Sequence, residues 1–130
     1  MSGWDIKIKL LYAADKNSFF TIDTICNGES FDVIANVEIG ENLNEVLDGF
    51  DLWVSIRNLS QSNTLLTNQI SRALTPANNV PFNDEIRVAF NGGWKANEGD
   101  ILQAVATYKV TAGANTAYSE DESTRFIVSG

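Results

Sequence analysis

The chain has no histidine and one cysteine among its 130 residues. Without imidazole, the usual general base at neutral pH is absent, as is the commonest nitrogen ligand for zinc or copper. The single cysteine, Cys26, cannot form a disulfide within the chain, so the fold does not depend on an oxidising compartment. Any catalytic group would have to be a carboxylate, a lysine, a tyrosine or this thiol.

Long apolar runs are also missing. No stretch reaches the length of a transmembrane helix. The start, Met1 to Lys9, lacks the uninterrupted apolar core of a signal peptide. A complete chain is therefore expected in the cytoplasm, whereas a chain whose leader had been removed would be secreted or held at the cell surface.

Positive charge is scarce, because nine Lys and Arg face 17 Asp and Glu for a formal net charge of −8. This balance repels phosphate backbones and anionic lipid surfaces over about a Debye length. We therefore expect neither nucleic acid nor a membrane as a partner.

The size and composition of the chain are those of one folded domain spanning residues 1–130. Hydrophobic residues make up 44% and charged residues 20%, which is ordinary for a globular protein. Such a chain can bury one core without disulfides or metals.

Apolar and polar residues alternate most clearly from Leu102 to Val110, which predicts a half-buried strand. Similar patterns predict strands at 4–12, 19–26, 31–39, 52–57, 85–90 and 125–128. Residues 40–49 suit a short helix or an irregular crossover, 59–74 suit either a strand or a short helix, Pro76–Pro81 is a loop, and Ala112–Ser119 is a hairpin-like connection.

Side-chain parity predicts which face each strand buries. In the first strand, Trp4, Ile6, Ile8 and Leu10 share a face and two lysines take the other, which suits an exposed edge strand. In the second, Cys26 is in phase with Phe20 and Ile22, so we expect a buried thiol. The predicted core is Phe31, Val33, Ala35, Val37, Leu52, Val54, Ile56, Ile86, Val88, Phe90, Leu102, Ala104, Ala106, Tyr108, Val110, Phe126 and Val128.

Short alternating strands separated by Gly, Asn and Asp turns predict an all-β sandwich. The segment Ala106-Thr107-Tyr108-Lys109-Val110 resembles the penultimate strand of immunoglobulin and fibronectin type III modules, over roughly residues 19–130. The resemblance implies an immunoglobulin-like antiparallel β-sandwich of about seven or eight strands. It departs from antibody domains in lacking a cysteine pair and in having Ala104 where an Asp would stand. The resemblance therefore implies a similar architecture for this chain but says nothing about its function.

Trp53 is the strongest single candidate for a binding residue, because the alternation of side chains along its strand places it on the face opposite the predicted core. In an immunoglobulin-like order it shares a sheet face with neighbouring outward residues, and a mixed aromatic, aliphatic and cationic face suits a protein partner. The predicted partner surface is Trp53, Arg57, Val105, Lys109 and Ile127. Alternatively, the 40–49 crossover covers this face, or a β-bulge turns Trp53 inward.

A second hypothesis concerns carbohydrate. Trp4, Trp53 and Trp94 could form a stacking platform for sugar rings, with Asn and Asp side chains supplying hydrogen bonds. The alternative for Trp94, which follows two glycines, is a loop aromatic that closes one end of the sandwich.

Acidic residues gather at Asp48 and Asp51, at Asn97 to Asp100, and at Glu120 to Glu122. They could supply oxygen ligands to calcium, yet none has the spacing of a known calcium loop, so we expect solvated turns and no metal site. Paired carboxylates could also act as acid and base, but turn residues give no such geometry. Asn58-Leu59-Ser60 fits the glycosylation pattern, which matters only on a secretory route.

The sequence therefore predicts a non-catalytic protein interaction or structural module without a cofactor, binding a protein partner or a second copy of itself. The alternative is a carbohydrate-binding module. No residue is expected to be catalytic, since the chain has no phosphate loop, nucleophile elbow or triad.

Overall fold

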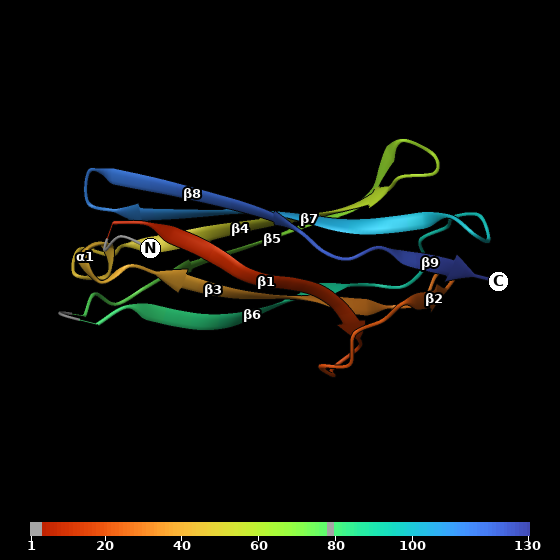
Figure 1. Ribbon diagram of the computed structural model, residues 1–130, viewed down its shortest axis with the longest axis horizontal. Coiled ribbons are helices and arrows are strands. Elements are labelled where there is room, and N and C mark those ends of the chain that lie inside the picture. The colour runs from red at the N-terminus through yellow and green to blue at the C-terminus, as the bar shows by residue number, and fades with distance from the viewer. Residues whose placement is uncertain (1–3, 78–79) are drawn as a thin grey trace.

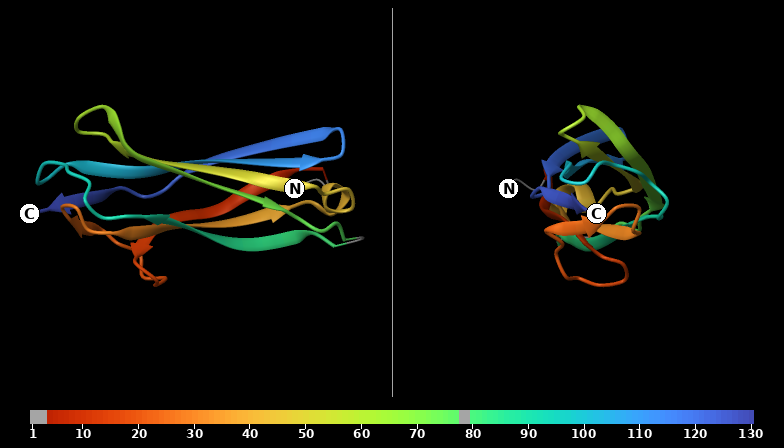
Figure 2. Two further views of the ribbon diagram at one scale, coloured as in Figure 1. Left: turned by 180° about the vertical axis from the view of Figure 1, so that it is seen from behind. Right: turned by 90° about the vertical axis from the view of Figure 1, so that its right-hand side faces the viewer.

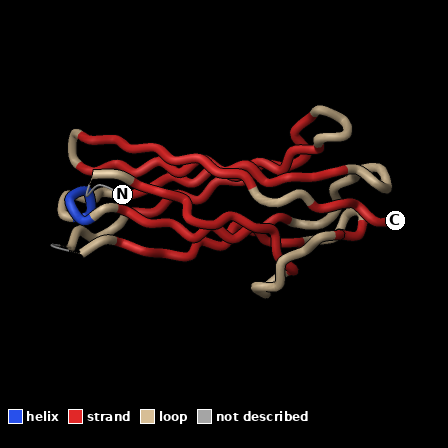
Figure 3. Tube along the Cα trace, viewed as in Figure 1, coloured by secondary structure: helices blue, strands red, loops and turns tan. Residues whose placement is uncertain are grey.

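The computed structural model describes residues 4–77 and 80–130, and almost all of its regular structure is β (Figures 1 and 3). The described residues form two packed sheets, which confirms the all-β sandwich. The strands are β1 (Ile6–Asp15), β2 (Thr24–Cys26), β3 (Phe31–Ile39), β4 (Gly49–Asn58), β5 (Asn63–Ala73), β6 (Phe82–Phe90), β7 (Ile101–Ala112), β8 (Asn115–Glu122) and β9 (Phe126–Ser129), and the one helix is α1 (Glu41–Asn44).

One sheet has the order β1-β3-β6, and the other has the order β2-β9-β7-β4-β5 with β8 also paired to β7. Both β8 and β9 run antiparallel to β7, at different points along it. They are therefore two pieces of one interrupted strand, which is why nine strands stand where seven or eight were predicted. The pairing is not wholly antiparallel, because β2 runs parallel to β9.

The chain passes between the two sheets more than once, with β1 and β3 in one sheet, β4 and β5 in the other, and β6 back in the first. The edges of β1 and β8 approach each other, and the amide of Ile8 donates to the Ser119 hydroxyl (3.2 Å). On the opposite side, Asn68 Nδ2 of β5 donates to the carbonyl of Ala89 in β6 (2.7 Å). The two sheets thus also touch at their edges.

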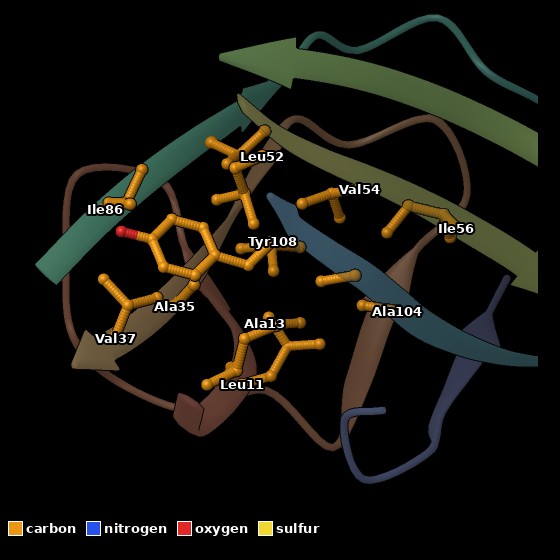
Figure 4. Packing of buried hydrophobic residues seen from close by; sticks show 14 of the residues in the cluster. Leu11, Ala13, Ala35, Val37, Leu52, Val54, Ile56, Ile86, Ala104 and Tyr108 are labelled. Atoms are coloured by element: carbon orange, nitrogen blue, oxygen red, sulfur yellow. The ribbon is translucent and has the colours of Figure 1, made fainter. Parts of the chain in front are cut away.

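Every predicted core residue is buried, at most 3% exposed. Figure 4 shows the inward side chains of β3, β4, β6 and β7 meeting between the sheets. At one end Phe31 stacks on Phe90 at 5.2 Å between ring centroids and meets Phe126 edge-on at 5.9 Å. Period-two alternation therefore predicts these strands well, because β3 pairs with β6 and β4 pairs with β7 in unbroken register.

The predicted phase of the first strand is wrong beyond Ile8. Its register against β3 shifts between Ile8 and Leu10, as at a β-bulge, and the extra residue reverses the parity. Leu11 and Ala13 are consequently buried, while Leu10 is 50% exposed. Trp4, before the strand, is 52% exposed. The prediction of an edge strand with outward lysines is confirmed.

The predicted strand at 19–26 is mostly a loop. The chain makes a turn at Asp15–Ser18, returns to an isolated bridge between Ala14 and Thr21, and reaches the other sheet only as β2. Alternation does not survive this crossing, so Ile22 and Ile25 are buried whereas Phe20 is 76% exposed. The expected buried thiol is likewise wrong, because Cys26 is exposed.

Three less regular segments complete the fold. The 40–49 region contains α1, as predicted, at one end of the sandwich (Figure 1). The undecided 59–74 region is the strand β5. The supposed connection at 112–119 is a tight turn followed by β8. In the predicted Pro76–Pro81 loop, Asn78 and Asn79 lie outside the described residues, as do Met1 to Gly3.

Candidate functional site

The outer face of the six-stranded sheet carries the predicted partner surface. Because Leu52, Val54 and Ile56 are fully buried, the residues between them on β4 point away from the core. Trp53 is 37% exposed there. The register shift of β4 against β5 lies beyond it, between Ile56 and Arg57, so it does not turn Trp53 inward.

Strand register fixes the neighbours of Trp53. It stands opposite Gln69 of β5 on one side and Thr107 of β7 on the other. In the adjacent row, Asp51 stands opposite Lys109, and Lys109 stands opposite Tyr118 of β8. Same-face rows are about 7 Å apart along a strand, so Lys109 lies diagonal to Trp53 and directly across from Tyr118, and one row and two strands separate Trp53 from Tyr118.

The other predicted residues lie on the same face, each farther from Trp53 along the strands. Val105 stands opposite Ser55, Arg57 opposite Gln103, and Ile127 opposite Ile101. From Ile101 to Lys109 the strand rises about 26 Å, so the five predicted residues form a stripe and not one patch. Ile127, 45% exposed, is at the end remote from Trp53.

Tyr118 is the residue that the sequence interpretation missed. It is 63% exposed beside Lys109, more open than Trp53. A signal was present, because Ala117, Ser119 and Asp121 alternate with outward residues of β8. The turn-like composition of 112–119 obscured it. We call Trp53, Lys109, Tyr118 and Gln69 the aromatic patch.

Polar groups border the aromatic patch. Ser71 donates to the Asp51 carboxylate within the row of Lys109. Along β8, Glu120 lies across from Thr107 and Glu122 from Val105. A shallow hollow next to the patch is lined by Gln103, Val105, Glu120, Asp121, Glu122 and Ser123. The face therefore combines two exposed aromatic side chains with charged groups between and around them.

The three tryptophans do not form a common platform. Trp94 is 7% exposed, its indole Nε1 donates to the Glu29 carbonyl (2.8 Å), and its ring packs edge-on against Phe31. It closes one end of the core, as the alternative reading expected. Trp4 precedes β1, in the sheet opposite Trp53. Only Trp53 of the three lies on the open face of the larger sheet.

The acidic turn residues have structural partners. The Asp100 carboxylate is buried, and it accepts hydrogen bonds from Asn58 Nδ2 (2.8 Å) and the Asn97 amide (2.9 Å). The bond from Asn58, then that from Asn97, holds the pKa of Asp100 below its ordinary value. The expectation of a solvated turn is thus wrong for Asp100. Asn58 is itself buried, which removes it as an accessible glycosylation site.

Asp48 accepts a hydrogen bond from the Gly113 amide (2.9 Å), and Glu120 to Glu122 belong to β8 and not to a loop. Across residues 4–77 and 80–130, no three Asp, Glu or Cys side chains gather closely enough to hold a metal ion. In the same ranges no helix has the length and apolar character needed to cross a membrane.

A buried carboxylate on the smaller sheet was not predicted. Asp32 accepts from Arg87 Nη1 (2.7 Å), Lys16 Nζ (3.0 Å) and the Asn17 amide (2.9 Å). Burial raises the pKa of Asp32, but these three donors outweigh it and leave the pKa lowered. Its position in an alternating strand gave no sign of the loop that covers it.

Comparison with known proteins identifies no family. No protein-family model matches the chain, and no curated protein matches it. Among solved structures it is similar to a Bacteroides fragilis chain provisionally described as a beta-galactosidase, at 12% identity and a TM-score of 0.45. That match covers 90% of this chain and 17% of the other, so the chain spans a small part of that protein's length.

Proposed function

We propose that the protein is a non-catalytic interaction module whose partner surface is the outer face of the six-stranded sheet, centred on Trp53. The observation that carries the proposal is the 37% exposure of Trp53 on an open sheet face, with Tyr118, 63% exposed, one row and two strands away on the same face. Aromatic side chains supply large contact area at little entropic cost and dominate interface energetics.

The surroundings of Trp53 support a protein partner. Lys109 lies between Trp53 and Tyr118, and Arg57 and the carboxylates of β8 lie on the same face. Trp, Tyr and Arg are the side chains enriched at the energetic centres of protein interfaces. The crossover that contains α1 lies at the end of the sandwich, so this face stays open (Figure 1).

Affinity capture with matched variants tests the proposal. Wild-type protein should retain a partner that Trp53→Ser and Tyr118→Ser both lose. Leu10→Ser, which removes another half-exposed apolar side chain from the opposite sheet, should retain it. Equal capture by Trp53→Ser and the wild type would contradict the proposal.

A carbohydrate ligand is the second candidate, now limited to the aromatic patch. Gln69 beside Trp53, and Asp51 and Lys109 in the next row, place hydrogen-bonding groups around one indole. A glycan array distinguishes the two candidates. Sugar binding lost in both Gln69→Ala and Trp53→Ser would favour carbohydrate, whereas no binding to any glycan would leave the protein partner.

A further inference from the structure

Strand β5 is the outermost strand of the six-stranded sheet on one side, and its far edge is open. Figure 2 (left) shows β5, in light green, crossing the side of the sandwich between β4 and β6. It pairs with β4 along one edge, and no strand of the described residues pairs with the other. Its register against β4 is unbroken from Leu66 to Ala73, and none of its 11 residues is buried. We call the unpaired side of residues 66–73 the β5 edge.

Alternate residues of β5 turn their backbone groups toward this edge. The Leu74 amide donates to the Asp48 carbonyl (2.9 Å), which extends the β4–β5 ladder by one pair beyond Gly49 and Ala73. In an antiparallel ladder, hydrogen-bonded pairs alternate with pairs whose N–H and C=O groups point outward. The even-numbered residues of this stretch therefore bond to β4. The backbone groups that point to the β5 edge are those of Thr67, Gln69, Ser71 and Ala73.

One of these groups already binds an amide. The Gln69 N–H donates to Asn68 Oδ1 (2.8 Å), while Asn68 Nδ2 donates to the Ala89 carbonyl of β6 (2.7 Å). A side-chain carboxamide thus fills the place that a peptide group of another strand would take. In the part of the chain that the structure describes, the other three amides of the β5 edge have no hydrogen-bond partner. The edge therefore offers an extended backbone the donors and acceptors of a sheet.

The other strand edges of the sandwich are protected, whereas the β5 edge is not. Proteins block strand edges with charged side chains, bulges or very short strands. β1 has two outward lysines and a bulge, β6 and β8 have three charged residues each, and β2 has 3 residues. β5 has 11 residues, no proline and one charged side chain, Arg72. A further strand is therefore least opposed at the β5 edge.

Hollows lie at both ends of the β5 edge. Residues 66–68 line a groove of about 470 Å³ that no charged side chain lines. Residues 71–73 line a second hollow of about 360 Å³, to which Asp48 and Asp51 also contribute and in which Arg72 is the one cation. The track along the edge thus passes from a neutral end to an end that has two carboxylates.

We propose that the β5 edge binds an extended polypeptide segment of another protein, which adds a strand to the sheet and places a Lys or Arg side chain against Asp51. Strand addition takes its affinity from main-chain hydrogen bonds and its specificity from alternate side chains. The backbone groups of the edge recur about every 7 Å, a spacing that another strand matches and that a sugar or a lipid headgroup does not.

Charge selects a cationic segment over a second copy of this chain. The net charge of −8 attracts a cationic partner and opposes another molecule of the same acidic protein. Asp51 stands opposite Ser71, so its carboxylate lies one strand from the edge. Main-chain pairing at this edge needs neither Trp53 nor Tyr118, so the inference goes beyond the proposed function and does not depend on it.

Proline substitution tests the proposal with a peptide probe. Random decapeptides displayed on phage are panned against the wild type, and enriched peptides are synthesised for affinity measurements. Proline at residue 67 or 71 removes an amide that points to the edge and leaves the bonds to β4 intact, so the fold should tolerate it. We expect enriched peptides to carry Lys or Arg near one end. They should bind Thr67→Pro and Ser71→Pro about tenfold more weakly than the wild type or worse.

Matched variants separate the backbone from the side chain. Thr67→Ala and Ser71→Ala keep both amides and should bind the peptides as the wild type does. Asp51→Asn keeps an acceptor for the Ser71 hydroxyl but removes the negative charge, so it should weaken binding and reduce its salt dependence. Equal affinity of the peptides for Asp51→Asn and the wild type would contradict the cationic contact.

A second readout needs only the wild-type protein. Methylating alternate backbone nitrogens of an enriched peptide should abolish binding when the methylated amides face β5, and preserve it when the other set is methylated. If a proline variant does not fold, as its melting curve reports, this comparison replaces it.

Three results would overturn the proposal: equal affinity for Thr67→Pro and Thr67→Ala, equal affinity of the two methylated peptides, or no enriched peptide at all. Sedimentation velocity examines the other occupant. A wild type that self-associates while Ser71→Pro stays at 14.3 kDa would assign the β5 edge to a second copy instead.

Discussion

Arg87 Nη1 lies 2.7 Å from Asp32 Oδ2, and the Asp32 side chain is 1% exposed. This pair joins β6 to the first residues of β3, while Lys16 brings the loop of residues 15–20 to the same carboxylate. Ala14 and Ala89 flank Asp32 in the neighbouring strands, so small side chains leave room for the loop to cover it.

Replacing Asp32 with Asn should lower the free energy of unfolding by about 1–3 kcal/mol, because two cations lose their partner while water still reaches about a third of each. Urea denaturation measures the change. Asp15→Asn, an exposed carboxylate of the same loop, is the control and should have little effect. Equal midpoints for Asp32→Asn and the wild type would contradict the role given to this network.

The same carboxylate predicts a loss of stability in acid. The pKa of Asp32 is lower in the folded state than in the unfolded chain. Its contribution is therefore complete above the unfolded value of about 3.9 and disappears as the pH falls through the folded value. Below about pH 4 the wild type should lose stability more steeply than Asp32→Asn. Parallel pH profiles would show that Asp32 contributes nothing to acid sensitivity.

Tyr108→Phe should leave the fold as stable as the wild type or stabilise it by about 1 kcal/mol. The Tyr108 hydroxyl is buried, no protein group in the described ranges bonds to it, and burial raises its pKa. Removing a buried polar atom without a protein partner costs no hydrogen bond to the rest of the chain. A drop of more than about 1 kcal/mol in urea denaturation would show that the hydroxyl is engaged.

Val54→Asp and Val88→Asp should each abolish soluble, folded protein. Both side chains are fully buried in opposite sheets, where a carboxylate would enter an apolar layer without a partner. Solubility and circular dichroism report the outcome. A wild-type melting curve for both variants would mean that the strand phases are misassigned.

Chelation should not affect the fold. With EDTA present, the free energy of unfolding should stay within about 0.5 kcal/mol of its value without EDTA, because a metal bound only to the folded state would add more by mass action. A large fall in melting temperature would restore the acidic residues as a calcium site.

The sequence predicts β4 and β7 because side chains along each strand alternate between a buried and a more open side. Leu52, Val54 and Ile56 alternate strictly with outward residues, and β7 does so from Ile101 to Ala112. That parity also correctly sends Trp53 to the outer face. For these elements, local pattern and tertiary environment agree.

Two failures occur where the chain leaves a regular ladder, and two others have different causes. One bulge after Ile8 reverses the phase of β1, and a loop replaces the strand that would have buried Cys26. Tyr118 was hidden by polar composition, although its strand is regular. Asp32 was not recognisable, because its partners Lys16 and Arg87 are 16 and 55 residues away and meet it only in three dimensions.

The affinity and stability of Trp53→Ser, measured against a partner retained by the wild type, test the central claim most directly. We expect an unchanged urea midpoint, since the indole packs outside the core, and binding weaker by about 2 kcal/mol or more, which is roughly 30-fold in Kd. Undiminished binding would remove Trp53 from the contact surface, and an unfolded variant would place it in the core and contradict the account.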